Sequence, residues 1–109
     1  MHIDISGLRI DLTDALHDHV NTEFKKFEKI LDPSARIVVE IGKTTDHHKQ
    51  GDIFKAEGRI IEPKAEYFAN IVSEDLYTAI NSLSDELFQQ VTESKRSSSN
   101  TTKTRQFYD

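Results

Sequence analysis

Four segments of the chain alternate hydrophobic and polar residues, a period that predicts half-buried β-strands. They cover residues 2–8, 36–43, 52–61 and 67–72. In the third segment, Ala56 and Ile60 share one face while Arg59 falls on the other. The polar residues 44–51 separate the second and third segments and end in a glycine. This arrangement predicts an antiparallel hairpin with a long tip.

Two further segments repeat apolar residues at helical spacing. The first begins at Thr13, a favourable N-cap, and continues to Leu31, because the Asp-Pro pair that follows ends a helix. The second runs from about Glu74 to Val91. The predicted order is therefore β-α-β-β-β-α. We expect an α+β fold in which a four-stranded sheet carries both helices on one face.

The composition changes after the second predicted helix. Residues 95–109 are rich in Ser, Thr and charged side chains, which predicts a disordered tail. Residues 1–94 then form a single domain, as a chain of 109 residues leads us to expect.

Charge is distributed unevenly along the chain. The net charge of −5 excludes a uniformly basic coat of the kind that covers many nucleic-acid-binding proteins. Residues 65–94 contain no Lys or Arg and six Asp or Glu, whereas residues 36–64 and 95–109 carry a net positive charge. Cationic surfaces are therefore expected from the middle of the chain and from the tail.

No motif of a known catalytic type is present in the sequence. The chain has no Cys, which excludes a thiol nucleophile, a disulfide and a Cys-ligated metal. It also lacks a Gly-rich phosphate loop, a GxSxG motif and an HExxH motif. We predict a protein that is not an enzyme and that has no cofactor and no small-molecule substrate.

The pair His47-His48 is the one feature that could suggest a metal site. Asp46 or Asp52 could assist, but adjacent histidines in a loop chelate poorly unless other ligands converge. The alternative is an exposed polar loop, or one that contacts RNA phosphates and base edges, and we expect no metal. No apolar run approaches the ~20 residues that span a bilayer, and the first residues do not resemble a signal peptide. The prediction is a cytoplasmic protein with no membrane partner.

Several cations could meet RNA phosphates together. They fall in the last turns of the first helix, at the ends of the second strand, at the hairpin tip, on the outward face of the third strand and in the tail. The candidates are Lys25, Lys26, Lys29, Arg36, Lys43, His47, His48, Lys49, Lys55, Arg59, Lys95 and Arg96. The alternative for each is an ordinary solvated surface charge.

Three stretches resemble one known family. The opening MHIDISGLRIDLTDALHDHVNTEFKKFEKIL is similar to that family's first strand and helix, including a T-[DPE]-A-[LI] helix start. The stretch EDLYTAINSLSDEL resembles its E-D-M-Y-A-A-I-D-x-x-x-D-K-L, and GKTTDHHKQGDIFKAE resembles a variant of its hairpin. The matching residues in the second stretch are Glu74, Asp75, Tyr77, Ala79, Ile80, Asp85 and Leu87. Over residues 1–95 the chain resembles the short ribosome hibernation promoting factors, also called ribosome-associated inhibitor or sigma-54 modulation proteins.

This resemblance implies a fold like that of double-stranded RNA-binding domains and no catalysis. It implies a protein that binds the small ribosomal subunit and its 16S rRNA in the channel where tRNA and mRNA would sit. Such a protein blocks translation in stationary phase or under stress. We expect it to be a monomer when it is away from the ribosome.

The second helix departs from the family pattern. Lys26 and Lys29 match basic positions of the family's first helix. In the second helix, however, Glu86 replaces the lysine of D-K-L, and Phe88 occupies the next position that is usually basic. Only Lys95 and Arg96 fall near the family's terminal basic run, so the alternative function is a protein-interaction module. In that alternative, the acidic helix binds a basic partner and RNA binding is weakened.

Overall fold

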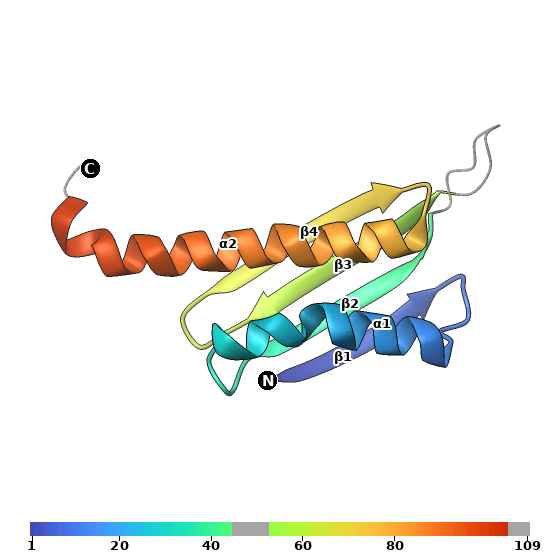
Figure 1. The fold of residues 1–109 in the computed structure, drawn as a ribbon, viewed down its shortest axis with the longest axis horizontal. Helices are drawn as coiled ribbons and strands as arrows, with labels where there is room; N and C mark the ends of the chain where they lie inside the picture. The colour runs from blue at the N-terminus through green and yellow to red at the C-terminus, as the bar shows by residue number, and fades with distance from the viewer. Residues whose placement is uncertain (45–52, 105–109) are drawn as a thin grey trace.

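A computed structural model describes the backbone of residues 1–44 and 53–104, with side chains as far as Arg96. It contains four strands and two α-helices, and a short 3₁₀ helix, η1, follows the first of these (Figure 1). The elements are β1 (His2–Leu8), α1 (Asp14–Phe24), η1 (Lys25–Lys29), β2 (Arg36–Lys43), β3 (Phe54–Ile61), β4 (Glu66–Ser73) and α2 (Leu76–Thr104).

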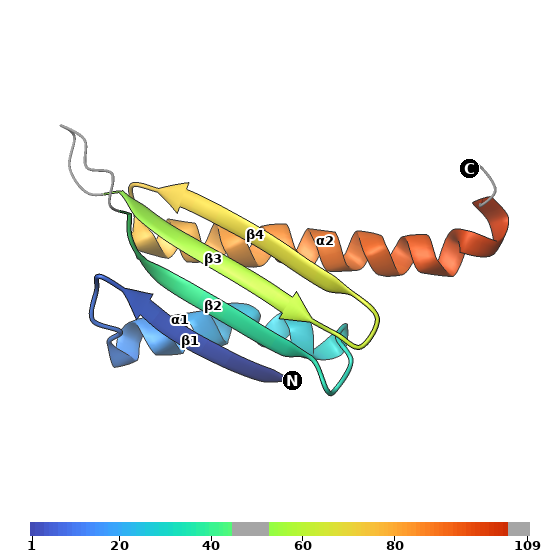
Figure 2. The ribbon, with the colours of Figure 1, turned by 180° about the vertical axis from the view of Figure 1, so that it is seen from behind.

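The strands form one mixed sheet in the order β1-β2-β3-β4. β1 pairs with β2 in parallel, while the β2–β3 and β3–β4 pairs are antiparallel. The parallel pair requires a crossover, which α1 provides. Both helices lie on the same face of the sheet, and Figure 2 shows the other face without a helix. The predicted α+β fold, its element order and the β2–β3 hairpin are confirmed.

The first helix begins where the sequence predicts, but it changes form earlier than expected. The Thr13 Oγ accepts a hydrogen bond from the Leu16 backbone N at 3.2 Å, so Thr13 is the N-cap. The α-helix ends at Phe24 and the chain tightens into η1, so the prediction of one helix to Leu31 was wrong. Phe24 and Phe27 stack with ring centroids 5.3 Å apart. A spacing of three residues suits both helix types, which is why the apolar pattern did not distinguish them.

The second helix is longer than the sequence predicted. It begins after Asp75, whose carboxylate accepts hydrogen bonds from the backbone N and the hydroxyl of Thr78, both at 2.8 Å. The prediction ended the helix near Val91 and placed residues 95–109 in a disordered tail, whereas α2 continues through residues 95–104. Residues 105–109 lie outside the described part, and the division into a domain and a tail stays a prediction. We call residues 92–104 the α2 extension, and the far end of this helix projects beyond the sheet (Figure 1).

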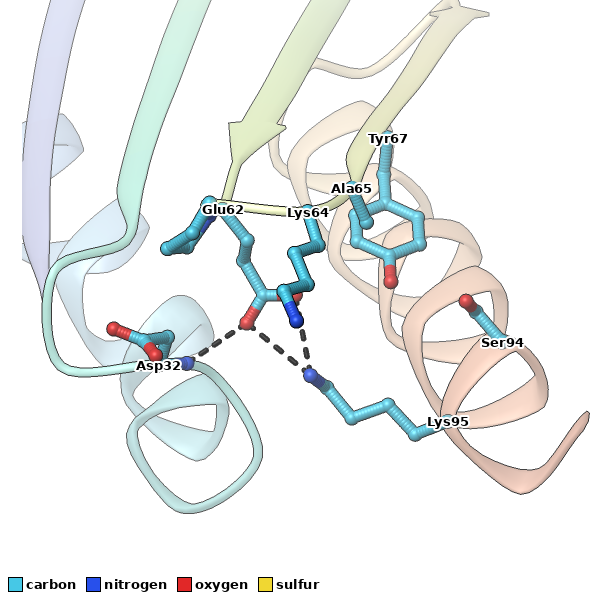
Figure 3. A pocket seen from close by; sticks show the side chains of 8 residues that line it. Asp32, Glu62, Lys64, Ala65, Tyr67, Ser94 and Lys95 are labelled. Carbon is cyan, nitrogen blue, oxygen red and sulfur yellow. Dashed lines mark hydrogen bonds and ion pairs between the residues drawn. The ribbon is translucent and has the colours of Figure 1, made fainter. Parts of the chain in front are cut away.

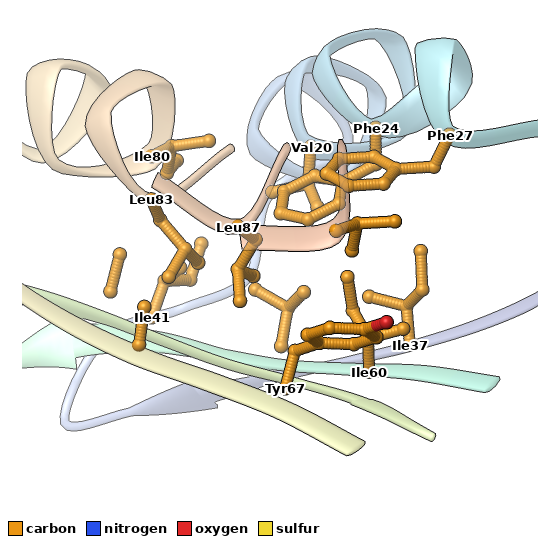
Figure 4. Close-up of a cluster of buried hydrophobic side chains, with 14 of the residues drawn as sticks. Val20, Phe24, Phe27, Ile37, Ile41, Ile60, Tyr67, Ile80, Leu83 and Leu87 are labelled. Carbon is orange, nitrogen blue, oxygen red and sulfur yellow. The ribbon is translucent and has the colours of Figure 1, made fainter. Parts of the chain in front are cut away.

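The hydrophobic core fills the space between the sheet and the helices (Figure 4). Phe27, Ile37 and Leu83 are among its fully buried side chains. Gly58 allows α2 to pass close to β3, since a Cβ at this position would lie 2.8 Å from Leu87 Cδ1. The buried Ser84 Oγ donates to the Glu23 carbonyl oxygen at 3.1 Å and thereby joins α2 to α1.

Candidate nucleic-acid interface

The structure distributes the candidate cations over several surfaces on both sides of the sheet. Lys25, Lys26 and Lys29 lie on η1 in the helix layer, and Arg36, Lys55 and Arg59 lie on strands. Lys43 ends β2, and Lys95 and Arg96 belong to the α2 extension. The remaining candidates, His47, His48 and Lys49, lie outside the described residues, as does the rest of the predicted hairpin tip at 45–52.

The sheet face that carries no helix, which we call the open face, has an ion cluster at its centre. Lys55 Nζ lies 3.0 Å from a carboxylate oxygen of Glu40 and 3.1 Å from one of Glu57. Register explains the cluster, because Glu40 and Glu57 are paired across β2 and β3. The Lys55 side chain is only 18% exposed. Its pKa is raised above the ordinary value by the hydrogen bond to Glu40 and then by the one to Glu57.

Two arginines on the open face are also paired with carboxylates. Arg36 lies 2.5 Å from Asp4 of β1, and this hydrogen bond is the main cause of the lowered pKa of Asp4. Arg59 lies 2.6 Å from Glu66, and its guanidinium carbon is 5.1 Å from the centre of the Phe68 ring. The three candidate cations on this face are therefore balanced by acidic neighbours. An RNA phosphate would have to compete with those carboxylates, so this face is a poor phosphate-binding surface.

The cations on η1 have a different environment. Lys26 extends toward α2, where its Nζ lies 3.1 Å from an Asp85 carboxylate oxygen and 5.0 Å from the centre of the Phe88 ring. Lys25 and Lys29 are exposed and have no ion-pair partner in the described part of the chain. Within that part, these two lysines are the candidates best placed to meet an approaching phosphate.

The residues of α2 that depart from the expected basic pattern have different surroundings. Phe88 is half-buried and packs edge-on against Phe27, with ring centroids 5.4 Å apart. The position where the family resemblance leads us to expect a basic residue is therefore a contact between helices here. Glu86 and Glu93 are exposed, and they accept hydrogen bonds from Gln side chains of α2 itself. These two carboxylates leave a negative charge on the outer surface of α2.

A hollow that no sequence pattern indicated lies between the β3–β4 turn and α2. Figure 3 shows the turn between β3 and β4 facing α2 across this space, which has a volume of about 720 Å³. Lys95 Nζ lies 3.1 and 3.2 Å from the two carboxylate oxygens of Glu62. The Glu62 side chain is 5% exposed and also accepts a hydrogen bond from the Asp32 backbone N at 2.8 Å. No local sequence pattern shows that α2 passes beside the turn at residues 62–64.

The structure adds two observations on other kinds of site. The described residues contain no group of three or more His, Cys, Asp or Glu side chains that could hold a metal ion. The suggested ligands His47 and His48 fall outside those residues. Within the same described part, no helix is both long and apolar enough to cross a membrane.

Comparison with known proteins places the chain in a family. Residues 3–98 match the family model described as sigma 54 modulation protein / S30EA ribosomal protein. The ribosome hibernation promoting factor of Azotobacter vinelandii is 36% identical over 96 residues, which cover 87% of this chain and 83% of the relative. The factor of the same name from Escherichia coli K12 is 30% identical over 97 residues, with coverages of 87% and 94%. The chain belongs to the sigma 54 modulation protein / S30EA ribosomal protein family.

Solved structures support the same fold. The N-terminal domain of Protein Y from Thermus thermophilus superposes with a TM-score of 0.73 at 23% identity, covering 85% of this chain and 98% of that one. A ribosomal subunit interface protein from Coxiella burnetii gives a TM-score of 0.71 at 18% identity, covering 88% and 99%. The family resemblance seen in the sequence is confirmed. The predicted likeness to double-stranded RNA-binding domains stays a prediction.

Proposed function

We propose that this protein is a ribosome hibernation factor that binds the small ribosomal subunit and inhibits translation. The observation that carries the proposal is the family match over residues 3–98, together with relatives named ribosome hibernation promoting factors. The mechanism is steric. Cationic side chains hold phosphates of 16S rRNA, and the folded domain occupies the space that tRNA and mRNA need. The protein then acts in the cytoplasm, as a monomer before it binds.

We propose that the helix layer, and not the open face, contacts the rRNA. Lys25 and Lys29 are exposed and have no ion-pair partner among the described residues, whereas Arg36 and Arg59 are neutralised by carboxylates. The α2 extension projects beyond the sheet and carries Arg96. Binding of rRNA would therefore centre on η1 and the extension.

Co-sedimentation with purified small subunits over a salt series tests the function. Saturable binding that weakens as salt rises is expected, because each phosphate contact releases counterions. A translation assay in vitro should show inhibition over the same range of protein concentrations. Absence of binding at low salt would reject the proposed function.

Two matched double variants test the surface. Lys25→Gln with Lys29→Gln and Arg36→Gln with Arg59→Gln each remove two positive charges from an exposed surface. The first pair should weaken binding and flatten the plot of log K against log salt by about 0.7–0.9 for each lost contact. The second pair should leave that slope within error of the unchanged protein. A larger loss from the second pair would move the interface to the open face.

The rival function is a protein-interaction module whose acidic α2 binds a basic partner. It is favoured by the exposed Glu86 and Glu93 and by the absence of Lys and Arg from residues 65–94. The variant Glu86→Lys with Glu93→Lys separates the two functions. Under the ribosome proposal, binding to small subunits becomes tighter, because repulsion of phosphates is replaced by attraction. Loss of ribosome association in this variant would favour the rival.

A further inference from the structure

We propose that the hollow between the β3–β4 turn and α2 is a binding site for one phosphate group of an RNA chain. The phosphate chemistry follows from the side chains around the hollow. The choice of RNA as its source rests on the proposed function. Lys64, Tyr67 and Ser94 are not among the twelve candidate residues, so this site adds to the surface that we assign to η1 and the α2 extension.

The first observation is an unpaired hydroxyl directed into the hollow. Tyr67 is 8% exposed, and its ring belongs to the core. Figure 3 shows its hydroxyl pointing into the space between Lys64 and Ser94. No described residue forms a hydrogen bond with that hydroxyl. Because the hydroxyl faces the hollow and has no partner among the described residues, it is available to a ligand there.

The second observation is that further donors border the same space. The Ser94 hydroxyl has no hydrogen-bond partner in the described part of the chain, and it approaches from α2. Lys64 is exposed and has no ion-pair partner in that part, and Lys95 borders the hollow from α2. The Lys64 ammonium group supplies an unpaired positive charge, and the two hydroxyls supply hydrogen bonds to an anion. Phosphate oxygens accept these donors readily.

The acidic residues of the hollow are already engaged by protein donors. Both oxygens of Glu62 face Lys95, and one of them also accepts a hydrogen bond from the Asp32 backbone N. The Asp32 carboxylate accepts hydrogen bonds from the backbone N and the hydroxyl of Ser34, at 2.9 and 2.7 Å. Glu62 therefore holds Lys95 at the edge of the hollow, while Lys64 remains free to meet the anion.

The test is an NMR titration of the full ¹⁵N-labelled chain with three additives at matched ionic strength. Inorganic phosphate tests the site, a four-residue uridine oligonucleotide tests RNA, and sodium chloride is the control. We expect phosphate and the oligonucleotide, but not chloride, to cause saturable shifts in the amides of residues 62–67 and 94–95. Equal responses to chloride, or no response at these amides, would overturn the site. A response to phosphate alone would overturn RNA as its source.

Two tyrosine variants give a matched comparison. Tyr67→Phe keeps the ring in the core and removes only the hydroxyl, and it should weaken phosphate binding about five-fold or more. Tyr77→Phe removes the hydroxyl of an exposed tyrosine near the start of α2 and should change nothing. Lys64→Gln, at an exposed position, gives a second variant that leaves the core unaltered. Unchanged affinity in both Tyr67→Phe and Lys64→Gln would reject the assignment.

The outcomes also separate this proposal from the proposed function. If the oligonucleotide binds at the hollow but small subunits do not co-sediment with the protein, the ribosome proposal fails and the phosphate site stands. If small subunits bind but the hollow responds to neither phosphate nor the oligonucleotide, the phosphate site fails and the ribosome proposal stands.

Discussion

The two faces of the sheet are stabilised by different interactions, although alternate residues of the same strands supply both. On the covered face, Ile37, Val39 and Ile41 of β2 are fully buried beneath the helices. On the open face, the neighbouring Arg36 and Glu40 join ion pairs that cross the strands. Burial of apolar area supplies most of the stability of a domain, whereas exposed ion pairs contribute little. The covered face thus holds the fold together, and the open face neutralises charges that would otherwise repel one another or attract anions.

The largest effect that separates the faces should come from removing an aromatic ring. Phe27→Ala leaves a cavity beneath η1 and should lower the free energy of unfolding by about 3–5 kcal/mol. Phe68→Ala removes the same ring from the open face, where the residue is 43% exposed, and should cost less than about 1 kcal/mol. Urea denaturation measures both values. Similar losses of unfolding free energy in the two variants would mean that the Phe68 ring on the open face is covered in solution.

A smaller effect should follow from removing the cation at the centre of the open face. Lys55→Gln leaves Glu40 and Glu57 without their shared cation and should lower the Tm. Because the folded state raises the pKa of Lys55 above its ordinary 10.5, the ion cluster stabilises the fold fully below that pH. This stability is lost as the pH rises through the raised pKa. The difference in Tm between the two proteins should therefore be constant from pH 7 to 9 and shrink at still higher pH, a trend that thermal melts can check.

The smallest effect should come from the exposed pair at the edge of the open face. The folded state lowers the pKa of Asp4 below its ordinary 3.8, chiefly through the hydrogen bond from Arg36. The resulting stability is present above pH 3.8 and is lost as the pH falls through the lowered value. The Tm of Asp4→Asn should therefore be slightly lower than that of the unchanged protein at pH 6. The two Tm values should be almost equal at the lowest pH where the protein remains folded. A difference in Tm that grows toward low pH would contradict the assigned pair.

Local patterns were sufficient to predict the fold. Alternation located all four strands, and the N-cap at Thr13 located the start of α1, because both signals lie within a few adjacent residues. The end of α2 was placed too early, since the Ser- and Thr-rich composition after Thr92 has low helix propensity and does not predict the observed continuation.

The candidate site was less predictable, because its properties depend on pairs that are distant in the sequence. Lys26 and Asp85 are 59 positions apart, and only the packing of η1 against α2 shows that they meet. Likewise, Arg36 and Asp4 are 32 positions apart and meet because β1 pairs with β2. Residue type identified the cations, but only the structure shows which of the described ones are already neutralised.

The position of α2 in the chain also constrains how the protein folds during its synthesis. The helix follows all four strands, yet it supplies Ile80, Leu83 and Leu87 to the core that covers β3 and β4. During synthesis those strands emerge before the helix that shields them, so their apolar face is exposed for that interval. The core closes only when residues up to Val91 are free. Slow translation of the α2 segment would therefore lengthen the period in which the nascent chain is prone to aggregation.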